Sequence, residues 1–101
     1  MKLIIATAIQ EYQDNIKDFL QKSEVIGYSF QMVKGYSNNA KDGIENNWFA
    51  SDNHETNSVA FFSFIKQEKT NTLFELVDEF NKTAPSKSHI HLAELAVDRI
   101  N

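Results

Sequence analysis

The spacing of apolar residues in the first part of the chain predicts a strand followed by a helix. Lys2 to Ile9 is a nearly continuous apolar run rich in isoleucine, which is typical of a strand buried on both faces. From Glu11 to Ser23 the apolar residues instead recur at helical spacing and would form one stripe facing the core; they are Tyr12, Ile16, Phe19 and Leu20.

Two further strands are predicted on either side of a long polar segment. Tyr28 to Tyr36 alternates imperfectly and has one largely polar face, which favours a strand at the outside of a sheet. Ser58 to Gln67 is apolar on both faces, which favours a central strand. Residues 37–57 lack apolar periodicity and exceed the about 12 to 15 residues beyond which a loop is usually functional or disordered. We therefore expect a functional loop at about 37–57.

The last part of the chain predicts a second helix and a fourth strand. Thr72 and Glu75 have capping-box spacing, and an apolar stripe follows them up to an end near Ala84-Pro85. His89 to Ile100 alternates as a strand. The order β-α-β-β-α-β predicts an α+β, ferredoxin-like domain spanning residues 1–101, with a four-stranded antiparallel sheet and two helices on one face.

The apolar character of the strands also predicts self-association. Two helices cover only one face of a sheet, yet three of the predicted strands are apolar on both faces. A whole exposed sheet face would form an apolar patch larger than monomers usually tolerate, so we expect another copy of the chain to cover it. The pattern alone does not give the number of copies.

Charge and composition narrow the classes of function. The formal net charge of -4 disfavours a nucleic-acid partner, because no basic stripe is available to neutralise phosphates. The chain has no cysteine, and the apolar residues 3–6 are too few for a signal sequence or a membrane span. The sequence contains no P-loop, Gly-x-Ser-x-Gly or dinucleotide-binding fingerprint. We expect a cytoplasmic protein that is not an enzyme, has no catalytic residues and does not insert into membranes.

The residues leading into the long loop carry a family resemblance. Gly27 precedes the second predicted strand, and Val33-Lys34-Gly35-Tyr36 is similar to the Val-Lys-Gly-aromatic signature that nitrogen regulatory PII signalling proteins have there. The chain resembles the PII-like superfamily, which also contains, more distantly, the CutA divalent-ion tolerance proteins. The resemblance implies a homotrimer whose sheets face inward, with a small effector bound in clefts between subunits and the long loop contacting a partner protein, such as a membrane transporter or a metabolic enzyme.

The resemblance also implies a set of ligand-binding residues. These are the signature residues with the next position, together with three cations beside the implied cleft: Lys34, Gly35, Tyr36, Ser37, Lys82, Lys87 and Arg99. The family makes an adenine nucleotide a candidate ligand, but Ser37 replaces a second glycine. Residues 82–88 also replace a phosphate-binding loop rich in glycine and lysine, so that loop is not matched, and Pro85 removes one amide. The alternative interpretation of the three cations is surface solubility.

Three apolar residues within the loop are candidate partner contacts: Ile44, Trp48 and Phe49. A large aromatic pair on a polar loop is the kind of anchor that carries binding energy at interfaces. The alternative is that the pair packs on its own or a neighbouring subunit, as the resemblance to CutA implies.

A metal site is the alternative function. His89 and His91 are two residues apart on a predicted strand and would point to one face, while the loop adds His54. A CutA-like protein would use such residues for a divalent metal, or would be a purely structural trimer.

Overall fold

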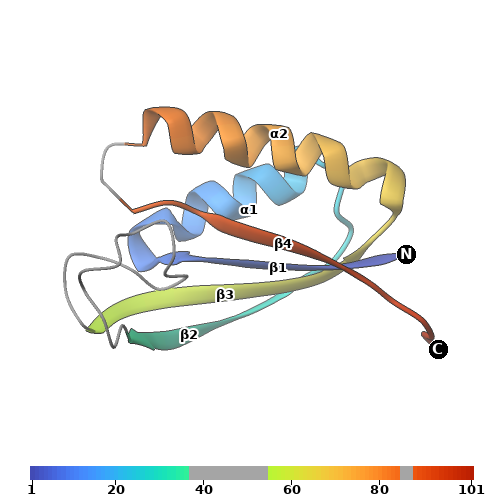
Figure 1. The fold of residues 1–101 in the computed structure, drawn as a ribbon, viewed down its shortest axis with the longest axis horizontal. Helices are drawn as coiled ribbons and strands as arrows, with labels where there is room; N and C mark the ends of the chain where they lie inside the picture. Colours follow the sequence, from blue (N-terminus) through green and yellow to red (C-terminus); the bar gives the residue numbers. More distant parts are fainter. Residues whose placement is uncertain (37–54, 85–87) are drawn as a thin grey trace.

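The strands of the protein form one antiparallel sheet in the order β2-β3-β1-β4, with both helices on one face (Figure 1). The structure is a computed structural model and describes residues 1–36, 55–84 and 88–101. Its elements are β1 (Lys2–Ile9), the 3-10 helix η1 (Gln10–Tyr12), α1 (Gln13–Lys22), β2 (Ser29–Tyr36), β3 (Glu55–Ile65), α2 (Gln67–Thr83) and β4 (His91–Ala96). The predicted ferredoxin-like arrangement is confirmed, including an edge position for β2 and a central one for β3.

The core lies between the helices and the sheet. Alternate residues of the two central strands point into it, and the apolar ones are at most 4% exposed; they are Ile4, Ala6 and Ala8 of β1 and Val59, Phe61 and Ile65 of β3. The predicted stripe of the first helix is buried against them. Phe80 of α2 meets Tyr12 and Phe19 edge to face, with ring centroids 4.9 and 5.6 Å apart. These aromatic contacts join the two helices over the sheet.

Helix α1 ends in a Schellman motif. The amide of Val25 donates to the carbonyl of Leu20, and the amide of Glu24 donates to the carbonyl of Gln21. This geometry requires a left-handed residue, and Glu24 has φ of 60°. Glycine is the usual residue at such a position, because it has no Cβ to clash. The Glu24 carboxylate also pairs with Lys69 near the start of α2, which lowers the pKa of Glu24 and raises that of Lys69.

Helix α2 begins at Gln67, five residues before Thr72, so the predicted capping box is not the start of the helix. The buried stripe explains the difference, because it begins at Thr70, which is 3% exposed, and continues through Leu73 and Val77. The Thr70 hydroxyl donates to the carbonyl of Gln67 over 2.8 Å, so the side chain can be buried without losing its hydrogen bond. Hydrophobic periodicity does not register a buried threonine, so the sequence pattern places the start of this helix one turn too late.

Two strand boundaries also differ from the prediction. Strand β3 begins at Glu55, because the β2 ladder extends over polar residues as far as the Tyr36–Glu55 pair; residues 55–57 therefore belong to a strand and not to the expected loop. Strand β4 covers only His91–Ala96, because its ladder with β1 ends at the Lys2–Ala96 pair. No helix in the described parts of the chain is both long and apolar enough to cross a membrane.

Candidate functional site

The end of β2 holds the signature residues in different environments. The Lys34 ammonium donates to the Asn57 side-chain oxygen over 2.7 Å and lies 3.3 Å from the Glu55 carboxylate. Gly35 is buried within the ladder, and Tyr36 is 63% exposed. Lys34 is therefore held above the first residues of β3, and Tyr36 presents its ring at the surface.

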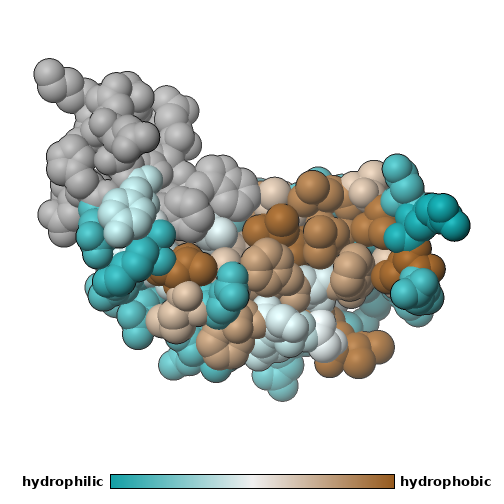
Figure 2. Space-filling model, turned by 90° about the horizontal axis from the view of Figure 1, so that it is seen from below, coloured by the Kyte–Doolittle hydropathy of each residue, from teal (hydrophilic) through white to brown (hydrophobic). Residues whose placement is uncertain are grey.

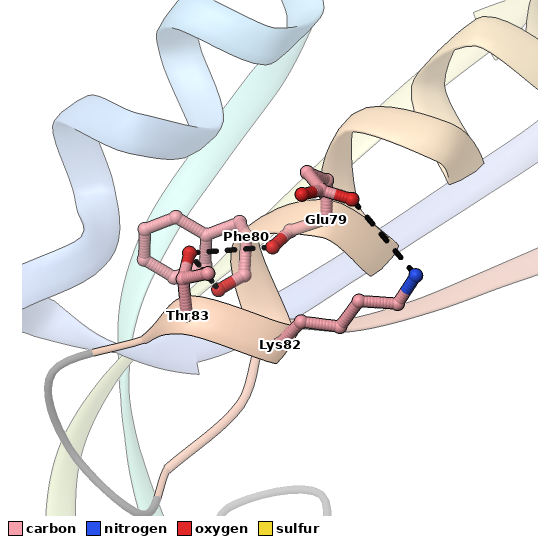
Figure 3. A network of polar contacts seen from close by, with 4 residues as sticks. All are labelled: Glu79, Phe80, Lys82 and Thr83. Carbon is pink, nitrogen blue, oxygen red and sulfur yellow. Dashed lines mark hydrogen bonds and ion pairs between the residues drawn. The ribbon is translucent and has the colours of Figure 1, made fainter.

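The end of α2 carries one of the predicted cations on an exposed turn (Figure 3). The Lys82 ammonium lies 3.9 Å from the Glu79 carboxylate, and both side chains are about three-quarters exposed. The Thr83 hydroxyl donates to the carbonyls of Glu79 and Phe80 over 3.4 and 3.5 Å. An exposed pair at this distance is weak, so the Lys82 ammonium is available to an anion.

Asn81 ties this turn to the start of β4. Its side-chain amide donates to the Ile90 carbonyl over 2.9 Å, and its side-chain oxygen accepts from the Ile90 amide over 2.8 Å. Ile90 itself is 2% exposed and belongs to the core. Both ends of the connection between α2 and β4 are thereby fixed. Sequence reasoning missed Asn81, although an asparagine shortly before the proline of a connection is a usable signal of side-chain to backbone hydrogen bonding.

The described candidate ligand residues do not converge within one chain. Lys34 to Tyr36 end β2, whereas Lys82 lies beside the start of β4, at the opposite edge of the sheet. Three strand spacings of about 4.8 Å separate these edges by about 14 Å. Arg99 follows β4 beyond the Lys2–Ala96 pair, at the other end of the sheet (Figure 1). The remaining predicted ligand and partner residues lie outside the described part of the chain; they are Ser37, Ile44, Trp48, Phe49 and Lys87.

The two described histidines lie at the start of β4. His91 is its first residue and pairs with Thr7 of β1, whereas His89 precedes the strand, so strand alternation does not fix its direction. Burial lowers the pKa of His91, and the neighbouring charge of His89 lowers it further. His54 lies outside the described residues. Within residues 1–36, 55–84 and 88–101, no three metal-binding side chains gather.

The sheet face opposite the helices is largely apolar (Figure 2). We call it the open face, and the strand register assigns to it Leu3, Ile5, Thr7 and Ile9, Ser29, Gln31, Val33 and Gly35, Thr56, Ser58, Ala60, Phe62 and Phe64, and His91, Ala93 and Leu95. Two rows of side chains cross three strands: Phe64, Leu3 and Leu95 in one, and Phe62, Ile5 and Ala93 in the other. Phe64 is 53% and Leu95 43% exposed. The predicted apolar second face is therefore present in the single chain.

A second surface, on the helix side of β2, was not foreseen from the sequence. Tyr28, Phe30 and Met32 are 40–49% exposed there, because the helices leave this edge strand partly uncovered. The Lys17 ammonium of α1 lies 4.7 Å from the centre of the Phe30 ring. A hollow of about 500 Å³ beside it is lined by Asp14, Lys17, Asp18, Gln21, Val25 and Tyr28. The imperfect alternation of this strand was the available signal.

Comparisons with known proteins agree with this architecture. No protein-family model matches the sequence, and no curated protein sequence is significantly similar to it. Among solved structures, the chain is similar to a DUF3240 family protein from Shewanella baltica OS155, with a TM-score of 0.68 and 15% identity over 99% of this chain and 92% of the other. It is also similar to CPII, a nitrogen regulatory PII-like protein from Thiomonas intermedia K12 solved with ADP, AMP and bicarbonate, with a TM-score of 0.66 and 14% identity over 99% and 94%.

The class that these features define is the ferredoxin-like α+β domain with an apolar open face. Within that class the chain has the PII-like fold over nearly its full length, as the resemblance of its sequence predicted.

Proposed function

We propose that this protein is a non-catalytic, PII-like regulatory protein that assembles as a homotrimer, binds a small effector between subunits and contacts a partner protein through residues 37–57. The observation that carries the proposal is the PII-like fold of nearly the whole chain together with its exposed apolar open face. A regulatory role fits the name of one structural neighbour, a nitrogen regulatory PII-like protein.

The open face supports self-association. Phe64 and Leu95 leave about half of their surfaces in water at the two ends of one apolar row, although burial of such side chains is favourable by about 25 cal/mol per Å². Another copy of the chain covers these two rows without burying a charged side chain, since every residue in them is apolar. The trimeric state itself comes from the resemblance to PII proteins.

The distribution of cations supports a site that is completed by a second copy. Lys34 to Tyr36 end β2, whereas Lys82 lies in the last turn of α2, whose Asn81 bonds the residue before β4. Strands β2 and β4 are the two edges of the sheet and lie about 14 Å apart by strand spacing, and Arg99 follows β4 at the other end of the sheet. A small anion cannot reach all of them in one chain. In an assembly, one edge of a chain meets another edge of its neighbour, and the sites then form in clefts between subunits. Lys82, with its weak ion pair, is the described cation best suited to an anionic effector.

A ligand screen tests the proposal. Thermal unfolding is measured with ADP, AMP, bicarbonate and divalent metals, because a ligand that binds only the folded protein raises the unfolding temperature by mass action. We expect an anion to raise the unfolding temperature of the wild type. The Lys82→Ala variant should lose that shift, although its unfolding temperature without ligand should equal that of the wild type. A shift with metal ions alone would favour the CutA-like alternative. No shift with any anion up to millimolar concentration would contradict an anionic effector.

The partner contact is tested separately. We propose that residues 37–57 bind a membrane transporter or a metabolic enzyme, and that Trp48 and Phe49 anchor the contact. Affinity capture with the wild-type chain should retain a specific partner. The Trp48→Ala, Phe49→Ala variant should lose that partner while its oligomeric state is unchanged. If the double variant changes the oligomeric state instead, the aromatic pair belongs to the trimer.

A further inference from the structure

The helix side of β2 carries a short apolar row that the helices leave partly uncovered. Its members are Tyr28, Phe30 and Met32, which are 40%, 40% and 49% exposed, and we call this row the β2 flank. Phe61 and Val59 of β3, which pair with Phe30 and Met32, are buried on the same side of the sheet. Among the described strands, β2 pairs only with β3 and forms an edge of the sheet (Figure 1). The layer of helices therefore stops short of the β2 flank.

Two rings of the β2 flank rest on the core. The Phe30 ring stacks on Phe61 with centroids 5.0 Å apart, and the Tyr28 ring meets Phe61 at 5.6 Å. Because Phe61 is only 2% exposed, it holds both rings in place before a partner binds, so binding orders few side chains. Alternate residues of a strand lie about 6.6 Å apart, so the row from Tyr28 to Met32 is about 13 Å long. About nine residues of an α-helix span the same length.

A polar stripe of α1 borders the β2 flank. Four of its residues at helical spacing line the hollow of about 500 Å³ together with Val25 and Tyr28; they are Asp14, Lys17, Asp18 and Gln21. The Lys17 ammonium lies over the Phe30 ring, and Asp18 pairs with Lys22 over 2.9 Å. Within the described part of the chain, Asp14 forms no ion pair. The border of the β2 flank therefore presents a carboxylate that is free to pair with a cation of a partner.

We propose that the β2 flank binds an amphipathic helix of another protein, whose apolar stripe covers Tyr28, Phe30 and Met32 and whose lysine or arginine side chains face Asp14. The exposed row lies on the sheet face that α1 and α2 cover, so an occupant of this row lies beside α1 in the helix layer. A strand added to the edge of β2 would instead direct half of its side chains to the open face. A helix therefore fits the uncovered surface better than a strand does.

The charge of the partner follows from the border. A helix beside α1 faces the stripe with the unpaired Asp14 carboxylate, and the formal net charge of the whole chain is -4. Basic residues at the edge of the partner's apolar stripe speed association and suppress acidic competitors. The register places the β2 flank on the side opposite the open face, so this inference does not depend on the proposed assembly.

The test uses synthetic peptides of about 18 residues, which are long enough to form a helix in water. The first peptide has a leucine stripe bordered by lysines and alanine elsewhere. The second has glutamates in place of the lysines, and the third has the composition of the first with a central proline that breaks the helix. NMR titration of the full chain, labelled with ¹⁵N, at physiological salt should show binding of the first peptide alone. The amide signals that shift should belong to residues 14–21 and 28–33.

Variants locate the site. Met32→Lys places a charge under the apolar stripe and should weaken binding of the first peptide by about tenfold or more. Asp14→Asn should weaken it by about two- to fivefold and reduce its dependence on salt, as expected for an exposed ion pair. Phe64→Lys is the matched control, because it adds the same charge on the open face, and it should bind the peptide like wild type.

The outcomes separate this inference from the proposed function. Equal binding of the proline peptide, or no binding of the first peptide to wild type, overturns the inference. Met32→Lys that binds like wild type overturns it too, and so does a loss of self-association in Met32→Lys, because the β2 flank is then a contact between copies. If Met32→Lys does not fold, Asp14→Asn decides, and unchanged affinity and salt dependence in that variant contradict the proposal. Loss of assembly in Phe64→Lys with intact peptide binding supports both proposals independently.

Discussion

At the scale of single residues, Glu24 stands in a backbone conformation that suits glycine better. With φ of 60°, its Cβ is strained, whereas the Schellman hydrogen bonds of Val25 and Glu24 need only the backbone. Glu24→Gly should raise the thermal midpoint by a few degrees, and Glu24→Val should lower it. Thermal unfolding followed by circular dichroism measures both.

The ion pair of Glu24 with Lys69 has to be separated from this backbone effect. Lys69→Gln removes the pair without changing the backbone at residue 24, and it should alter the midpoint little because both side chains are substantially exposed. If Lys69→Gln destabilises as much as Glu24→Val does, the ion pair and not the left-handed conformation governs this position.

Asn81 is the residue whose loss should matter most at the α2–β4 connection. Asn81→Ala removes both hydrogen bonds to Ile90, whose amide and carbonyl belong to a residue only 2% exposed. Leaving such groups unsatisfied costs about 1 to 3 kcal/mol of unfolding free energy. Chemical denaturation of the variant measures this loss.

Asn71 provides the matched control, because it lies on the exposed side of the same helix. Asn71→Ala should leave stability unchanged or raise it slightly, since alanine has the higher helix propensity. Equal losses for the two alanine variants would show that the Asn81 hydrogen bonds contribute nothing specific.

At the scale of elements, the pattern was most informative where apolar residues define the element. Strand β1 matches the predicted Lys2–Ile9, and the buried stripe of α1 is the predicted one. The pattern failed where polar residues carry the structure. Thr70 of α2 is buried with its hydroxyl hydrogen-bonded to the carbonyl of Gln67. Lys34 and Asn57, which are paired in the β2–β3 ladder, also share a side-chain hydrogen bond. Such pairings depend on the partner strand or turn, which hydrophobic periodicity does not record.

At the scale of the whole molecule, the sequence predicted the fold more completely than the site. The resemblance led to the PII-like fold, which the solved structures bear out. It also named ligand residues, but Lys34 lies on edge strand β2, Lys82 lies in the last turn of α2 near the start of the opposite edge strand β4, and Arg99 lies beyond the end of β4. A linear sequence does not say which residues meet across a subunit boundary. The proposed site therefore depends on the proposed assembly, which would bring these cations together.

The assembly can be tested at one position of the open face. Phe64 is 53% exposed and lies in the row with Leu3 and Leu95, so Phe64→Lys should leave the monomer folded but place a charge in the proposed interface. Because burying an unpaired charge costs several kcal/mol, self-association should weaken by about a hundredfold or more. Light scattering after size-exclusion chromatography measures the change.

Ile26 is the matched control for Phe64. It is fully exposed and lies between α1 and β2, outside the strands that form the open face. Ile26→Lys adds the same charge to the same chain, so it should preserve the assembly if the open face is the interface. If both lysine variants dissociate, added charge alone explains the loss. If Phe64→Lys assembles like wild type, the copies meet through another surface, and the exposed residues Tyr28, Phe30 and Met32 at and just before β2 become the next surface to test.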